Sequence, residues 1–196
     1  MDLVNRVKNI LVSPKTEWPT IDSENESSLS VLTKYVLLLA AIPAVASFIG
    51  YGLIGIKIPF LGHYASVSSG IRYAIMYYII MVGGVYITAF VIDLLAPNFG
   101  SEKNFNKAFS LVAYAYTPTF VGGIFYIYHS LSFLASLASI YSLYLLYIGL
   151  TPMMKTPADK QTSYFVVSLL VMVAAFIVLG LILTPILIGS AVASVL

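Results

Sequence analysis

The chain has 196 residues, of which 60% are hydrophobic and only 9% are charged, and its mean hydropathy is +0.95. Soluble domains carry roughly 25% charged residues, so this composition indicates an integral membrane protein. The net charge of +2 and the lack of any basic run exclude a nucleic-acid-binding surface. The absence of cysteine excludes disulfides, thiolate zinc sites and a cysteine nucleophile.

Residues 1–30 are expected to form an amphipathic helix and a polar linker on the cytoplasmic side. Within residues 1–12, apolar side chains recur at helical spacing, and Arg6 and Lys8 take the opposite face. This helix is too short to cross a bilayer. It fits the headgroup plane, with both cations toward anionic lipid, and it equally fits packing against the protein's own loops.

The next stretch contains helix-terminating and interfacial residues. Ser13 and Pro14 are typical of a helix start, so they end the first helix and can begin a second. Trp18, the single tryptophan, is expected to anchor the chain at the membrane interface. Residues 19–30 are polar and acidic, and this composition predicts a solvated linker.

Long uncharged runs define the membrane spans, since a helix needs about 20 apolar residues to cross the hydrocarbon. The run 108–154 is about twice that length, so it predicts two helices joined near Tyr128 to Ser130. Residues 31–196 are therefore expected to form a single all-α membrane domain. The predicted helices lie at about residues 35–56, 72–96, 108–128, 131–150 and 163–188.

Lysine and arginine positions predict the orientation of these helices. With the N-terminus in the cytoplasm, only Lys57 and Arg72 fall outside. All other cations then lie inside, which is a strong positive-inside bias and argues against dual topology. The C-terminus is expected outside the cell.

Asp93 is the only acidic residue within a predicted span. It lies in the last turn of the second helix, at the negative end of the helix dipole and at the membrane edge, so a compensating partner is expected. The candidates are Lys103 and Lys107 in the next loop, and the hydroxyls of Tyr114 and Tyr116. Two interpretations remain open: a proton or cation site, or a structural pair that fixes the corner between helices 2 and 3.

The third helix is expected to be interrupted, because Pro118 lies well inside it. The carbonyl that this proline frees needs a partner, and the hydroxyl of Tyr114 or of Thr117 is within a turn. Gly122 and Gly123 follow and allow a second helix to approach closely. The segment is interpreted either as a packing hub or as a broken helix lining a polar cavity.

Small residues also mark the neighbouring helices. Helix 2 has its own pair, Gly83 and Gly84, which favours helix packing. Helix 4 carries a serine stripe that can bond across helices and a tyrosine stripe typical of an aromatic belt. The serines are Ser132, Ser136, Ser139 and Ser142, and the tyrosines are Tyr141, Tyr144 and Tyr147.

No enzymatic site is predicted. His63 and His129 fall in predicted outer loops without partners at metal-ligand spacing. A catalytic carboxylate pair needs two acids in one cavity, and the spans offer one. The sequence therefore assigns no catalytic residue, no metal ligand and no cofactor.

The motifs resemble the Yip family of Rab/Ypt-interacting membrane proteins, and in particular its prokaryotic branch. Residues 113–118 (Ala-Tyr-Ala-Tyr-Thr-Pro) are similar to the family's tyrosine-proline motif in helix 3. Further similarity lies at residues 13–18, 93–99, 141–150 and 154–164. The resemblance implies five spans and a cytoplasmic N-terminus. The chain lacks the long N-terminal region and the D-L-Y-G-P element of eukaryotic members, which argues against binding of Rab-type GTPases.

The resemblance implies a fold more than a function, and together with the compact form it indicates the plasma membrane of a prokaryote. The favoured hypothesis is a non-enzymatic protein of the Yip type that scaffolds or organises membrane proteins or lipids, in contact with the bilayer and with other membrane proteins or copies of itself. Asp93 and the loops 97–107 and 151–160 are expected to form its cytoplasmic face. The loop residues expected there are Pro97, Lys103, Lys107, Lys155 and Lys160. The alternative is a small transporter or channel whose path is lined by helices 3 and 4 and Asp93.

Overall fold

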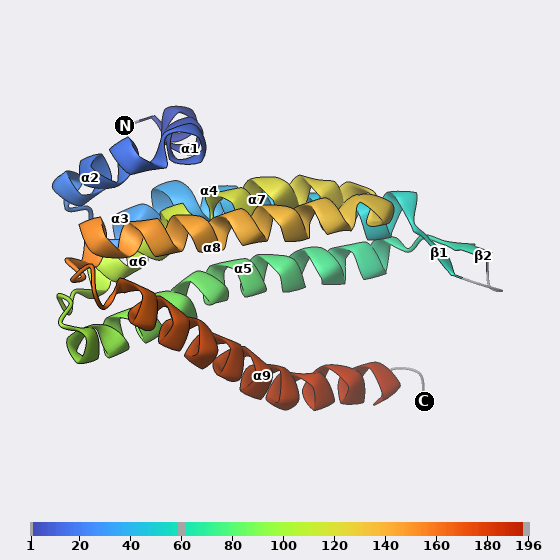
Figure 1. Ribbon diagram of the computed structural model, residues 1–196. Helices are drawn as coiled ribbons and strands as arrows, with labels where there is room; N and C mark the ends of the chain where they lie inside the picture. Colours follow the sequence, from blue (N-terminus) through green and yellow to red (C-terminus); the bar gives the residue numbers. More distant parts are fainter. Residues whose placement is uncertain (1, 59–61, 194–196) are drawn as a thin grey trace.

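The computed structural model describes residues 2–58 and 62–193 and shows an all-α membrane bundle. Within these residues, five helical segments are long and apolar enough to cross a membrane, which confirms the predicted fold class. The segments are Ser28–Ile54, Val67–Phe99, Phe105–Ile127, His129–Met154 and Gln161–Val178. Two short helices, α1 (Leu3–Val12) and α2 (Pro14–Glu24), lie across one end of the bundle (Figure 1).

Each span is built from the following elements. The first combines α3 (Ser28–Val31), η1 (Leu32–Val36), α4 (Leu37–Ser47) and η2 (Phe48–Ile54), of which η1 and η2 are π-helical. The second is α5 (Val67–Leu95) with the 3-10 turn η3 (Ala96–Phe99). The third is α6 (Phe105–Ala115), α7 (Thr117–Gly122) and the 3-10 segment η4 (Gly123–Ile127). The fourth is η5 (His129–Leu131) with α8 (Ser132–Met154), and the fifth is α9 (Gln161–Ala193).

A short antiparallel hairpin connects the first two spans, where the sequence predicted a loop. Strands β1 (Ile56–Ile58) and β2 (Gly62–Tyr64) pair with Lys57 opposite His63. The hairpin projects from the end of the bundle opposite α2 (Figure 1).

The N-terminal boundary differs most from the expectation. Residues 19–24 are helical and continue α2, so the predicted solvated linker is wrong there. Ile21 explains this difference, because its buried side chain holds α2 against the bundle. The first span also begins earlier than predicted, where the Ser27 hydroxyl accepts a hydrogen bond from the Ser30 N–H at 3.3 Å.

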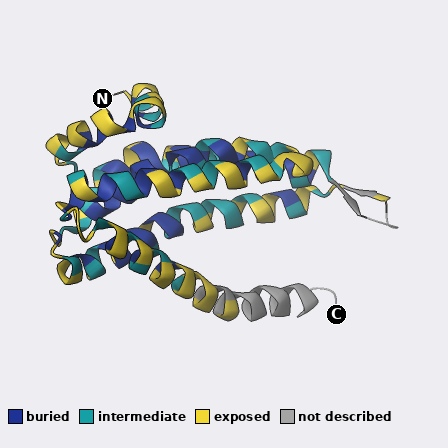
Figure 2. Cartoon of the chain, viewed as in Figure 1, coloured by how far each residue is buried: buried dark blue, intermediate teal, exposed yellow. Residues whose placement is uncertain are grey.

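The interrupted third span lies at the centre of the bundle. In its most apolar window 72% of the residues are buried, against 17% for the fifth span. Figure 2 shows the buried residues concentrated where α4, α6, α7 and α8 meet, and Figure 1 shows α9 diverging from α5 toward the C-terminus. The third span is therefore the element around which the others pack.

Candidate functional site

The third span breaks at Tyr116, and its two halves satisfy their freed backbone groups separately. The Thr117 hydroxyl donates to the Tyr114 carbonyl at 2.6 Å, which is the carbonyl that Pro118 leaves without an N–H partner. This contact confirms the predicted role of Thr117. At the start of α7, the Thr119 N–H donates to the Ser142 hydroxyl of α8 at 3.2 Å. A serine of the predicted stripe thus caps the broken helix from a neighbouring span.

The glycine pair after the break allows two close helix contacts, as predicted. A Cβ added at Gly122 would lie 2.4 Å from Ala138 Cβ, and one added at Gly123 would lie 2.5 Å from Pro43 Cβ. The pair in helix 2 behaves differently. A Cβ at Gly83 would meet nothing within 4 Å, and one at Gly84 would meet only Phe176 at 3.8 Å. Gly84 is buried and therefore packs against α9 as predicted, at an ordinary contact distance, whereas the prediction of helix packing is wrong at Gly83, which no described residue approaches.

Tyr114 and Tyr116 point to different neighbours. The Tyr114 ring packs edge-on against Tyr35, with centroids 4.6 Å apart, and the guanidinium of Arg6 lies 5.3 Å above it. Tyr35 in turn shares a 2.6 Å hydrogen bond with Thr117. The Tyr116 hydroxyl instead shares a 3.0 Å hydrogen bond with Thr88 of α5. The tyrosine motif therefore connects the break to the N-terminal helices on one side and to α5 on the other.

Arg6 is buried within an ion-pair cluster and does not face lipid. Its side chain is 4% exposed and forms salt bridges with Glu17 and Glu24. Burial opposes the charge, but the hydrogen bond and charge of Glu24, together with the charge of Glu17, outweigh it and raise the pKa of the Arg6 guanidinium. The expectation that Arg6 contacts anionic lipid is wrong, because two carboxylates of α2 enclose it. The spacing of Glu17 and Glu24, seven residues apart on one helix face, was the sequence signal for this cluster.

A second charged cluster holds α2 onto the spans. The Asp22 carboxylate pairs with Lys107 of α6 at 2.7 Å and with Lys155, after α8, at 2.5 Å. Burial alone would raise the pKa of the Asp22 carboxyl, but its hydrogen bonds and charge attraction with the two lysines outweigh burial and lower that pKa. Sequence reasoning missed Asp22, because its partners lie 85 and 133 residues further along the chain.

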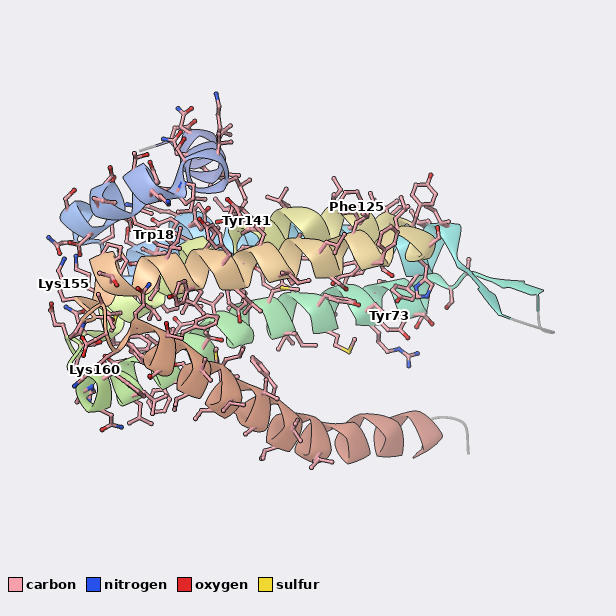
Figure 3. The ribbon with its side chains drawn as sticks, in the orientation of Figure 1. Trp18, Tyr73, Phe125, Tyr141, Lys155 and Lys160 are labelled. Carbon is pink, nitrogen blue, oxygen red and sulfur yellow. The ribbon has the colours of Figure 1, made fainter. Side chains whose placement is uncertain are left out.

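Trp18 is buried between α2 and α8 and is not an interfacial anchor. It is 1% exposed, and a Cβ added at Gly149 would lie 2.8 Å from its ring. The Tyr141 hydroxyl donates to the Leu11 carbonyl of α1 at 2.8 Å. Figure 3 shows Trp18 and Tyr141 beside the N-terminal helices, with Lys155 and Lys160 at the same end of the bundle. These contacts confirm the alternative in which the amphipathic segment packs on the protein itself.

The two loops expected to form one face do meet. The Ser101 hydroxyl donates to the Thr156 hydroxyl at 2.9 Å, and the Glu102 N–H donates to the Met154 carbonyl at 2.8 Å. We call α2 with the loops 96–104 and 155–160 the lysine-rich platform. Its exposed residues include Pro97, Lys103, Lys155 and Lys160.

Asp93 lacks the compensation that the sequence predicted. Its Oδ1 is buried and has no hydrogen-bond partner among the described residues. Lys107 bonds to Asp22, and the Tyr116 hydroxyl bonds to Thr88, so neither of these candidates reaches it. The hydroxyl of Tyr164 on α9 interacts electrostatically with Asp93 but donates its hydrogen bond to the neighbouring Ile92 carbonyl. None of the predicted partners (Lys103, Lys107, Tyr114 and Tyr116) forms a salt bridge or hydrogen bond with Asp93 within the described part of the chain, so the prediction of a structural pair with one of them is wrong.

Comparisons with known proteins show the family to which the chain belongs. The Yip1 domain matches residues 8–182, from α1 into α9. The chain is 30% identical over 127 residues to "Inner membrane protein YohC" of Escherichia coli K12, and equally to the protein of that name from E. coli O6:H1 strain CFT073. Each match covers 64% of this chain and 65% of the relative, so the chain spans just under two thirds of the relatives' length. No solved structure matches. Because the Yip1 domain covers the N-terminal helices and extends into the last span, the chain belongs to the Yip1 domain family.

Proposed function

We propose that the protein is a non-enzymatic scaffold of the plasma membrane that organises other membrane proteins or lipids through the lysine-rich platform. The observation that carries this proposal is the fixed position of α1 and α2: Arg6 pairs α1 with α2 and lies over the Tyr114 ring, and Asp22 pairs α2 with Lys107 of the interrupted span and with Lys155. A surface already held in place loses little conformational entropy when a partner binds, so it is well suited to docking.

The predicted orientation of the chain in the membrane supports this proposal. The platform end carries most of the cations, so the positive-inside rule places it in the cytoplasm and the hairpin end outside. The similarity to an E. coli inner membrane protein supports the plasma membrane as the location. A non-enzymatic role is supported by the described spans, in which Asp93 is the single carboxylate.

The chemistry of the platform favours a charged partner. Lys15, Lys103 and Lys160 are exposed on it, together with the acids Glu102 and Asp159, and a crevice of about 60 Å³ beside it is lined by Arg6 and Glu26, among others. Such a mixed-charge surface is suited to a segment of another membrane protein that carries both signs of charge, or to a second copy of this chain. Rab-type GTPases are not part of this proposal.

Site-specific photo-crosslinking in intact cells tests the scaffold. A photoreactive amino acid replaces Lys15 or Lys103 on the platform, and matched controls carry it at Tyr128 or Ser130, which are exposed at the opposite end. The platform positions are expected to give discrete higher-mass adducts, and the charge reversal Asp22→Lys is expected to weaken them. Equal adducts from both ends, or none from the platform, would contradict the scaffold.

A transporter or channel is the second candidate, and the unpartnered Oδ1 of Asp93 favours it. A buried carboxylate oxygen without a hydrogen bond is costly inside a membrane and is typical of ion or proton pathways. The path would run along α6, α7 and α8 from Asp93. Asp93→Asn is expected to abolish a pH-dependent flux in proteoliposomes. A wild-type protein that moves none of a broad panel of solutes would count against this candidate.

A further inference from the structure

A cavity of about 260 Å³ lies between the interrupted span, α8 and α9, away from the platform. It is lined by the hydroxyls of Tyr116, Thr119, Ser139 and Ser142, together with apolar side chains. Among the described residues that line it, none is charged. Tyr116 and Ser142 each lie near the middle of their spans, which places the cavity deep in the bilayer.

Three of these hydroxyls form a directed chain that leaves acceptor capacity in the cavity. Ser139 donates to the Ala135 carbonyl at 3.0 Å, and Thr119 donates to Ser139 at 3.3 Å. Thr119 and Ser142 share a further bond of 2.8 Å, in which Ser142 is then the donor. All three protons are used, but each hydroxyl oxygen has two lone pairs, so the Ser139 and Thr119 oxygens can each accept another hydrogen bond.

The Tyr116 side of the cavity adds a further hydrogen-bonding group. Tyr116, which lines the cavity, and Thr88 share a single hydrogen bond, which leaves one O–H of that pair available. A hydroxyl proton without an acceptor is costly in hydrocarbon, so this O–H and the spare acceptor sites of Ser139 and Thr119 indicate that a ligand group belongs here.

The surroundings define the chemistry of that ligand. Ile140 and Leu143 line the cavity and are exposed on the lipid-facing surface, so the cavity opens sideways to the bilayer. A charged group would be buried without a counter-ion at this depth, and a purely apolar chain would leave the spare O–H of the Tyr116–Thr88 pair without an acceptor. A neutral group that both donates and accepts hydrogen bonds satisfies the site.

We propose that this cavity binds the hydroxyl-bearing end of an uncharged amphiphile that enters laterally from the bilayer. The inference does not rest on the scaffold function, because the cavity and the platform share no residue. The competing source of the same chemistry is a water-soluble polyol that enters from outside the membrane, and the experiment below separates the two.

Photolabelling of the full chain in phosphatidylcholine nanodiscs tests the site. The probe is a photoreactive long-chain alcohol, and labelled residues are located by mass spectrometry. Saturable labelling is expected around residues 116–119 and 139–146. Decanol is expected to compete, whereas decane, which lacks the hydroxyl, and glycerol, which lacks the chain, are not. Equal competition by decane would overturn the hydroxyl requirement, and competition by glycerol would overturn entry from the bilayer.

Variants of the hydroxyl chain give a second readout. Thr119→Val combined with Ser139→Ala removes two hydroxyls with little change of shape, and two membrane hydrogen bonds correspond to a loss of about fivefold to tenfold in the affinity for the alcohol. Ser136→Ala is the matched control on the same helix, since Ser136 is exposed and outside the cavity. Unchanged affinity in the double variant would overturn the proposal. If that variant does not fold, the decanol and decane competition on the wild-type chain decides.

Discussion

Adding one methyl group at Gly122 is expected to destabilise the bundle more than any change at the helix 2 glycines. A Cβ at this position would lie 2.4 Å from the Ala138 Cβ, so α7 and α8 would have to separate by more than about 1 Å to reach an ordinary carbon–carbon distance. Overpacking of this kind costs about 1–3 kcal/mol. The higher helix propensity of alanine returns at most about 1 kcal/mol, so Gly122→Ala should lose about 1–2 kcal/mol of the free energy of unfolding.

Two matched variants isolate the steric cause. Gly83→Ala adds the same methyl where nothing lies within 4 Å, so it should be neutral or stabilising by up to about 1 kcal/mol. The exchange variant Gly122→Ala with Ala138→Gly moves the methyl across the contact, and its next neighbours would lie at 3.6 Å or more. It should recover wild-type stability to within about 1 kcal/mol, because the propensity changes cancel.

Unfolding by SDS in mixed micelles, followed by circular dichroism, measures all three variants. The reasoning would be refuted if Gly122→Ala unfolded at the wild-type SDS fraction, or if the exchange variant were no more stable than Gly122→Ala alone. Either result would mean that the stability of the bundle does not depend on the close contact between Gly122 of α7 and Ala138 of α8.

Three further predictions concern the charged clusters and the capped break. Glu17→Gln leaves the buried guanidinium of Arg6 with one charged partner, which costs about 3 kcal/mol. Amide hydrogen exchange in residues 3–24 should therefore accelerate by about 100-fold. The control variant Glu102→Gln changes an exposed carboxylate and should leave the exchange rates unchanged. The folded pKa of Asp22 is lowered, so its stabilisation is present above the ordinary carboxyl pKa and is lost as the pH falls through the folded value. Docking of α2, read from the fluorescence of the single tryptophan, should therefore weaken below about pH 4, and Asp22→Asn should remove this part of the pH dependence. Ser142→Ala removes the acceptor for the Thr119 N–H and should lower the free energy of unfolding by about 1 kcal/mol in the SDS titration. An unchanged free energy of unfolding would show that the Thr119 N–H finds another acceptor.

Sequence alone was sufficient for the number and approximate place of the spans and for the break in the third one. A span requires about 20 residues with little or no charge, so Lys34, Asp93, Lys107 and Lys155 lie near the ends of the observed spans, although the first three lie inside them. Proline lacks an N–H wherever it stands, so Pro118 had to interrupt the third helix, and the Thr117 hydroxyl was close enough to bond the freed carbonyl. These properties depend on local covalent structure and on the thickness of the bilayer.

The candidate site depended on contacts that no local pattern contains. Helical spacing places Arg6 opposite the apolar face of α1, but only the docking of α2 decides that carboxylates and not lipid lie there. The same docking buries Trp18, whereas no described residue approaches Gly83. Among the described residues Asp93 Oδ1 has no hydrogen-bond partner, and Lys107, one of the two lysines expected to pair with it, bonds to a residue of α2. Periodicity fixes the direction of a side chain around its own helix; the packing of helices far apart in the sequence decides what that side chain meets.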